Sequence, residues 1–344
     1  MMPRSHLFTF NRAGLHWGRG LLLLGVTLAP LVVLWVLGKE QYFLAAAFGV
    51  IFAAAADPGG RYAYRTSHLT VFVLAGALVT AIGFAMGASA WGWKTLAAFT
   101  VTLAAGLAAL YGAHRYIAAD MLNVWFIVAL ALASGYVASN TDSPTWAQAV
   151  AWTAGSVLWL AVAFLGWLAH RRKERPQPIA ELPGDISRRK LTAPLATFAV
   201  IRAVAIAITV AIAFGLGLDH ADWMPIAAIV AMKPSLEEAR TTSEQRLAGA
   251  FIGAVLAAVL LSTVANQRAL EILIVVCLAL GFAVRFANYA LYCAAIATAV
   301  LLALDLPNPG DLTSEVQRVL FTFLGLAIAL IVLVLAGLLA KRKA

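Results

Sequence analysis

The chain has 344 residues, of which 62% are hydrophobic and only 12% are charged. A soluble domain is about half apolar and about a quarter charged, so this composition excludes a water-soluble globular protein. The 25 basic residues outnumber the 16 acidic ones. They lie in short loops between apolar runs, which favours a role in membrane orientation and leads us to expect no nucleic-acid partner.

Apolar runs separated by short polar loops predict about twelve membrane-spanning helices. In chain order the predicted spans are residues 20–37, 42–56, 69–88, 95–111, 117–134, 147–169, 195–218, 223–232, 246–264, 270–283, 288–304 and 316–340. The first run, Leu21–Leu37, is too long for the core of a signal peptide, and we expect it to be retained as a span. The runs 42–56 and 223–232 are shorter than the roughly 20 residues of a straight crossing, so full crossing is left open there.

Lysine and arginine gather in alternate loops, including the proline-punctuated segment 170–192 and the C-terminal Lys341–Lys343. The intervening loops hold only Lys39, Lys94 and Arg268, with Arg318 at the edge of a span. Because cytoplasmic loops carry the excess of positive charge, we expect both termini and the segment 170–192 on the cytoplasmic side.

The two halves of the chain resemble each other. Arg115-Tyr116 precedes the fifth predicted span, and Arg285-Phe286 precedes the eleventh. An even number of spans in each half predicts parallel repeats related by an axis along the membrane normal. The expected fold is an all-α integral membrane protein of about twelve transmembrane helices in two parallel six-helix repeats. Residues 1–169 would form the first, degenerate repeat, residues 170–192 a basic cytoplasmic linker, and residues 193–344 the second repeat. Repeat transporters bind substrate between their repeats, so transport is expected.

Asp120 is the carboxylate most suited to proton exchange. It lies inside the fifth predicted span, and Asn123 falls on the same helix face three residues later. Desolvation in a helix bundle favours the protonated carboxyl, which could then exchange protons near neutral pH. The alternative is a carboxylate at a helix start, favoured by the helix dipole. The matching region of the second half has Asn288 and Tyr292 but no acid.

Arg202 has two interpretations that depend on where the seventh span begins. A start at Pro194 would bury the guanidinium, which offers a carboxylate substrate a bidentate partner. A start at Ile201 would let Arg202 extend to the cytoplasmic interface. The choice is left open by the sequence.

The turn before the eighth span contains His220, Asp222 and Trp223. Tryptophan is common at membrane interfaces, so an anchor is the plainer interpretation, although His220 could titrate near neutral pH. Gly249 and Gly253 form a GxxxG pattern, which indicates close helix packing. The sequence contains no phosphate-binding loop, nucleophile elbow or paired metal-ligand motif, so we expect no enzyme activity, cofactor or metal site.

The second half resembles the fusaric acid resistance protein family, which overlaps the aromatic acid exporters. The resemblance is carried by Arg202, His220–Trp223, Lys233-Pro234, Gln245–Gly249 and Gly253. Arg285 with Asn288-Tyr289 also resembles the polar start of that family's penultimate span. Unlike larger members, this chain has no sizeable cytosolic domain between its halves. The resemblance implies a functional or structural role for the residues of this chain that match the family's motif, which are Arg202, His220, Trp223, Pro234, Arg246, Gly249 and Gly253.

The resemblance implies a bacterial inner-membrane exporter of small organic anions, typically aromatic carboxylates, driven by the proton gradient. Its partners would be the anion, protons and the bilayer, with homo-oligomerisation left open. We expect Arg202, Arg246 or Arg285 to attract the anion and Asp120 to couple protons. Distant plant relatives are anion channels, so passive conduction is one alternative. A non-transporting scaffold that recruits partners through the basic linker is another.

Overall fold

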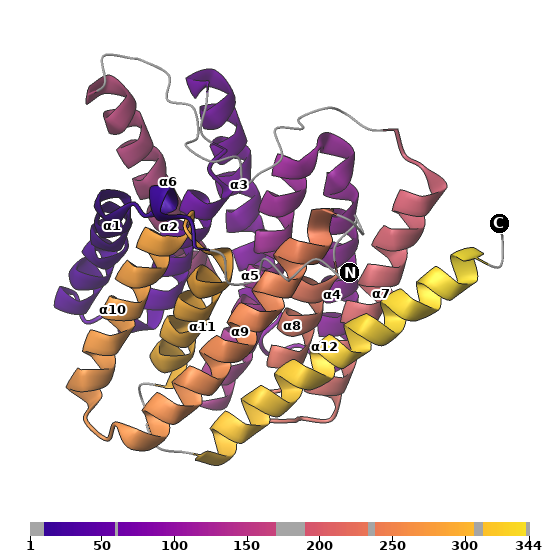
Figure 1. The fold of residues 1–344 in the computed structure, drawn as a ribbon. Helices are drawn as coiled ribbons and strands as arrows, with labels where there is room; N and C mark the ends of the chain where they lie inside the picture. The colour runs from indigo at the N-terminus through magenta and orange to yellow at the C-terminus, as the bar shows by residue number, and fades with distance from the viewer. Residues whose placement is uncertain (1–9, 59–60, 170–189, 233–237, 306–311, 342–344) are drawn as a thin grey trace. The chain divides into compact units, whose positions relative to one another are not determined.

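The computed structural model describes residues 10–58, 61–169, 190–232, 238–305 and 312–341. Within these ranges the chain forms twelve α-helices and no strand (Figure 1). Helices satisfy all their backbone hydrogen bonds within one segment, as a lipid environment demands. In chain order they are α1 (Trp17–Val36), α2 (Phe43–Ala56), α3 (Tyr62–Ala85), α4 (Trp91–Leu107), α5 (Ala113–Ala138), α6 (Thr145–Ala169), α7 (Ala193–Gly215), α8 (Trp223–Ala231), α9 (Glu238–Thr263), α10 (Gln267–Val284), α11 (Tyr289–Asp305) and α12 (Leu312–Lys341).

Seven helices in the described part of the chain are long and apolar enough to cross a membrane. They are α1 with its preceding turn, α3, α4 with its following turn, α5, α6, α7 and α10. The expected all-helical membrane protein is thus confirmed, with seven full-length candidates where about twelve spans were expected. Shorter apolar stretches lie at Glu40–Ala56, Ala248–Thr263, Tyr289–Ala303 and Val316–Val332. With only 9 residues, α8 is much shorter than a straight crossing.

The chain divides into two compact units, formed by residues 25–216 and by residues 1–24 together with 217–344. The first holds most of α1 and all of α2 to α7, and the second holds the start of α1 and α8 to α12. Although α7 follows the basic linker, it therefore packs with helices of the first half.

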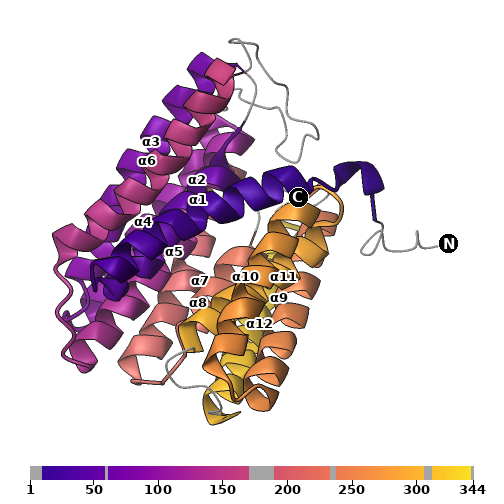
Figure 2. The same ribbon diagram turned by 90° about the vertical axis from the view of Figure 1, so that its left-hand side faces the viewer.

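In the unit of residues 25–216, α6 packs on α2 and α3, while α5 packs on α3 and α4 and α7 packs on α4. Figure 2 shows α3 and α6 side by side. The rings of Trp125 and Trp152 stack at 4.9 Å, and Phe48 lies 5.2 Å from Trp125. The indole N–H of Trp125 donates to the Thr80 hydroxyl at 2.8 Å, whereas that of Trp152 has no hydrogen-bond partner among the described residues.

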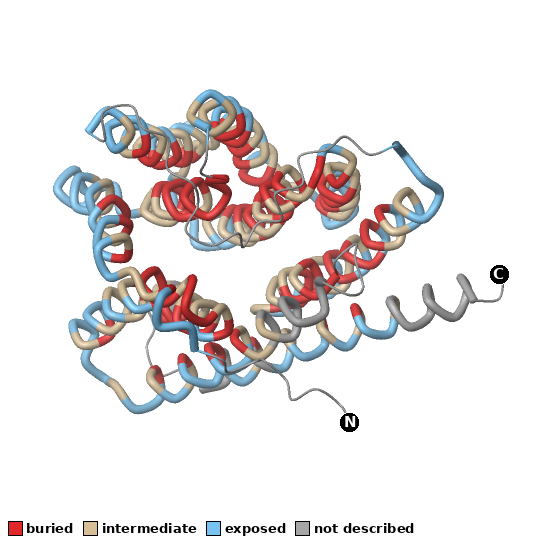
Figure 3. The backbone as a smooth tube through the Cα atoms, turned by 45° about the horizontal axis from the view of Figure 1, so that its top comes forward, coloured by how far each residue is buried: buried red, intermediate tan, exposed pale blue. Residues whose placement is uncertain are grey.

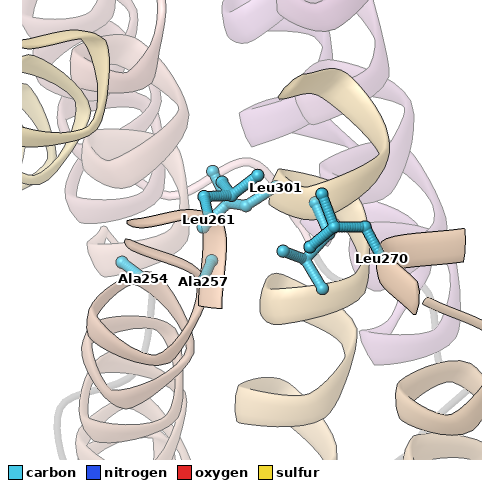
Figure 4. Packing of buried hydrophobic residues seen from close by; sticks show 6 residues of the cluster. Ala254, Ala257, Leu261, Leu270 and Leu301 are labelled. Atoms are coloured by element: carbon cyan, nitrogen blue, oxygen red, sulfur yellow. The ribbon is translucent and has the colours of Figure 1, made fainter. Parts of the chain in front are cut away.

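In the other unit, α8 packs on α12, and α11 packs on α9 and α10. Ala254, Ala257 and Leu261 of α9 meet Leu270 of α10 and Leu301 of α11 in a buried cluster (Figure 4). The segment before residue 25 joins this unit through its backbone. The N–H of Asn11 donates to the Ala287 carbonyl at 2.9 Å, and that of His16 donates to the Ala283 carbonyl at 3.1 Å.

Large apolar side chains remain exposed on the outer faces of the helices, including Trp35 of α1, Leu74 of α3 and Val150 of α6. Figure 3 shows buried and exposed positions on opposite sides of the same helices. Such broad apolar exposure is costly in water and favourable against lipid. The charged side chains described next lie on the buried faces.

Candidate functional site

Asp120 of α5 and Arg202 of α7 form an ion pair inside the unit of residues 25–216. Arg202 is 0% exposed and Asp120 is 3% exposed. Because α5 begins at Ala113, Asp120 lies about two turns inside its helix, away from the helix start. Helix α7 begins at Ala193 with Pro194 in its first turn, which suits the fixed φ of proline. The guanidinium of Arg202 is accordingly buried.

Small residues allow the helices around this ion pair to approach closely. A Cβ added at Gly106 of α4 would lie 3.0 Å from the Cβ of Ala199 in α7, so the two helices are nearly in backbone contact. Residue 199 lies one turn before Arg202, and this contact holds α7 where its arginine can reach α5. The ring of Tyr116 in α5 lies 5.8 Å from the Arg202 guanidinium carbon.

Several N–H donors at and near the Asp120–Arg202 ion pair have no hydrogen-bond acceptor within the described residues. Asn123 is 0% exposed and accepts a hydrogen bond from the Thr102 hydroxyl at 3.0 Å. Among the described residues, the side-chain N–H₂ of Asn123 and both Nε and Nη1 of Arg202 have no hydrogen-bond partner. Buried donors are rarely left unsatisfied, so these groups could bind water or the oxygens of an anion.

His220, Asp222 and Trp223 gather with Arg318 of α12 in the other unit. The Arg318 guanidinium lies 3.2 and 3.3 Å from Nδ1 of His220, whose backbone has a φ of 59°. Burial raises the pKa of the Asp222 carboxyl, and the nearby positive charge of Arg318 opposes that shift. Trp223 and Arg318 line an otherwise mostly apolar cavity of about 70 Å³. That volume is far below the roughly 300–1,000 Å³ of typical ligand sites.

The remaining predicted residues lie around α9 and α11. The Arg285 guanidinium carbon is 5.4 Å from the Tyr292 ring, and Asn288 caps α11 by accepting from the Leu291 N–H at 2.9 Å. A Cβ at Gly249 would lie 2.4 Å from the Ala290 carbonyl, and one at Gly253 would lie 2.6 Å from the Ala294 carbonyl. Both glycines therefore face α11. The side chain of Arg246 and all of Pro234 lie outside the described residues.

A second, partly buried ion pair in the unit of residues 25–216 was not expected from the sequence. Asp57, 5% exposed, accepts from Nε of Arg65 at 2.7 Å and from the Trp159 indole N–H at 3.1 Å. It directly follows the alanine-rich end of α2, and an acid after such a run could have signalled it. Arg318 was also missed as a site residue, although it stands near the start of an apolar run. Within the described ranges no cluster of His, Cys, Asp and Glu could hold a metal ion.

Apolar helices with charged side chains buried between them define a multi-pass membrane protein, and such intramembrane charges generally serve ion or solute movement. Residues 193–332 match the family model described as fusaric acid resistance protein-like. The match confirms, for this part of the chain, the resemblance carried by the sequence motifs, and the family suggests a membrane transport protein of the efflux type. Comparisons with curated proteins and with solved structures give no match.

Proposed function

We propose that this chain exports small organic anions, foremost aromatic carboxylic acids, across the bacterial inner membrane, using the proton motive force. The observation that carries the proposal is the buried Asp120–Arg202 ion pair, whose guanidinium has unpartnered Nε and Nη1 within the described part of the chain. A guanidinium binds carboxylates through parallel N–H groups, so an incoming acid can compete with Asp120 for Arg202.

Two components of the proton motive force act on such a site. An inside-negative potential drives an anion outward with about 2.3 kcal/mol per charge for each 100 mV. The pH difference acts on a carboxylate that exchanges protons, and Asp120 is the carboxylate within reach of Arg202. Displacing Asp120 from its partner would leave a buried charge, which a proton neutralises.

The proposal includes the arrangement of about twelve spans in two parallel six-helix repeats. Its support is that helix pairings in one unit recur in the other, six helices later. The pairs α2–α6, α3–α5 and α4–α5 have the counterparts α8–α12, α9–α11 and α10–α11. A Cβ at Gly155 of α6 would lie 2.1 Å from the Ala46 carbonyl of α2. One at Gly325 of α12 would lie 2.2 Å from the Met224 carbonyl of α8.

Uptake of labelled benzoate into inverted membrane vesicles tests the function. We expect uptake that collapses with a protonophore. Clamping the potential with valinomycin and potassium then separates the electrical component from the pH component. Asp120→Asn should retain uptake driven by the potential and lose the part that follows the pH difference. Arg202→Gln should lower uptake roughly 10–100-fold, the value of a hydrogen bond to a charged group.

Arg268→Gln is the matched control, because Arg268 is exposed at the start of α10 and its loss should leave uptake unchanged. Uptake that follows the benzoate gradient without any need for a proton motive force would indicate an anion channel. Absence of uptake for every aromatic acid tested would contradict the proposal. An Asp120→Asn variant with intact dependence on the pH difference would remove Asp120 from the coupling role.

A further inference from the structure

A cavity of about 540 Å³ opens within the unit of residues 25–216, between α3, the 3-10 turn Ala108–Tyr111 and the start of α5. This volume falls in the range of roughly 300–1,000 Å³ typical of small-molecule sites. Its wall combines aromatic and imidazole rings with one cation, and includes Tyr64, His68, Phe72, Tyr111 and Arg115. We propose that this cavity binds the planar aromatic carboxylate itself, with Arg115 as the group that holds the carboxylate; this inference rests on the proposed function.

The balance of charge singles out Arg115. Two other arginines in this unit are neutralised, Arg65 by Asp57 and Arg202 by Asp120. Among the described residues Arg115 has no ion pair with a carboxylate, and its side-chain partner is the Tyr64 hydroxyl. In the part of the chain that the structure describes, no Asp or Glu lines the cavity. The Arg115 guanidinium is half-buried and has no carboxylate partner in the described part of the chain, so a carboxylate ligand would balance its charge. It can bind such a ligand through two N–H groups.

The rings around Arg115 suit an aromatic acid better than an aliphatic one. The Tyr64 hydroxyl lies 3.3 Å from Nδ1 of His114, and the His68 and His114 rings meet edge to face at 6.4 Å. His68 is 1% exposed, so its ring belongs to the packed wall. Of these rings, Tyr64 and His68 line the cavity together with Phe72 and Tyr111, and aromatic rings favour edge-to-face or offset contact with an aromatic guest.

The cavity also lies close to the Asp120–Arg202 pair along α5. Gly112, with a φ of 91°, turns the chain from the 3-10 turn into α5 and thereby places Arg115 in the first turn of the helix. Asp120 follows five residues later, about 7.5 Å along the helix axis. Cavity-lining Ala118, Ala119 and Leu122 flank Asp120 on the same helix. An acid held by Arg115 is therefore within about one and a half turns of Asp120 along α5, although the two side chains leave the helix on different faces.

Isothermal titration of the purified full-length protein in nanodiscs with benzoate tests this assignment. Arg115→Gln should weaken benzoate binding about tenfold or more, and Arg115→Lys should recover only part of the affinity, because lysine lacks the bidentate fork. Hexanoate, with the same charge but no ring, should bind more weakly than benzoate to the unaltered protein. The matched control is Arg61→Gln, since Arg61 is an exposed arginine at the start of α3 that does not line the cavity. Thermal unfolding of each variant verifies that it is folded.

Vesicle uptake separates failure of this inference from failure of the proposed function. Benzoate uptake by the unaltered protein, combined with full benzoate affinity in folded Arg115→Gln, would overturn the cavity assignment and leave export standing. Uptake without measurable benzoate binding would overturn it too. If the unaltered protein neither binds nor takes up benzoate, the proposed function falls with it. Weakened binding in Arg115→Gln, with a raised KM for uptake and an unchanged maximal rate, supports both.

Discussion

The Asp120–Arg202 pair is stable only as a pair, because each charge is almost completely removed from solvent. Removing one partner of a buried ion pair typically costs about 3–5 kcal/mol, whereas replacing both by apolar residues is often neutral or stabilising. Asp120→Leu should therefore lower the free energy of unfolding by about that amount, and Asp120→Leu combined with Arg202→Met should recover most of it.

Thermal or denaturant unfolding of the purified protein in detergent measures this effect. Asp142→Leu serves as the control, because Asp142 is exposed in the loop before α6 and its replacement should change stability by no more than about 0.5 kcal/mol. A double variant destabilised by the sum of the effects of Asp120→Leu alone and Arg202→Met alone would show that the two charges act independently.

At the residue scale, the sequence identified Asp120 and Arg202 as candidate site residues but did not predict that they form an ion pair. An isolated charge in an apolar run is visible from composition, and Asp120 and Arg202 were each singled out in that way. They are 82 residues apart and fall in different predicted repeats, so no local spacing relates them. Their contact depends on α7 packing with α4, which rests on the close approach of Gly106 and Ala199.

At the element scale, the interface between α2 and α6 depends on a glycine. A Cβ at Gly155 would meet the Ala46 carbonyl, which belongs to the backbone and cannot rotate away. Gly155→Ala should therefore push the helices apart and destabilise the protein by about 1–3 kcal/mol, the usual cost of overpacking.

Gly166→Ala is the matched control on the same helix. No atom lies within 4 Å of a Cβ at that position, so the change should leave stability unchanged or raise it by up to about 1 kcal/mol through helix propensity. Unfolding curves of the two variants compare them directly. Similar stability for Gly155→Ala and Gly166→Ala would argue against close packing of α6 on α2.

Hydropathy located the helices well but marked their ends less well. Helix α9 begins at Glu238 although its span was predicted from residue 246, and α3 begins at Tyr62 where residue 69 was expected. The cause is physical. Apolar composition marks the part of a helix that meets lipid, whereas backbone hydrogen bonds continue through polar residues into the interface. The apolar stretch Ala248–Thr263 within α9 shows this difference.

At the scale of the whole molecule, the distribution of basic loops predicts the orientation in the membrane. In a variant without Cys277 and Cys293, a cysteine at Ser139 should react with a membrane-impermeant maleimide in intact cells. A cysteine at Arg61 should react only after permeabilisation. Both positions are exposed and lie at opposite ends of the predicted spans, so each controls for the other. The reverse pattern would place the termini outside.

The sequence predicted a helical membrane protein from composition and a repeat from matched motifs, but it did not predict how the chain divides in space. The compact units separate at residues 24–25 and 216–217, whereas the expected repeats meet at the linker 170–192. The expected repeat concerns only the order of helices along the chain. Which helices pack together depends on small-residue contacts such as Gly20 of α1 against Ala283 of α10.

This division has a consequence for biosynthesis. The unit of residues 25–216 has all its helices once α7 has left the ribosome, so it can assemble while the rest of the chain is still being translated. Residues 10–24 are made earlier but contact residues 283–287, which are made much later. Residues 10–24 are thus among the first segments synthesised and among the last to form their native contacts. A chain terminated before residue 283 would leave them in the bilayer without the segment that they contact.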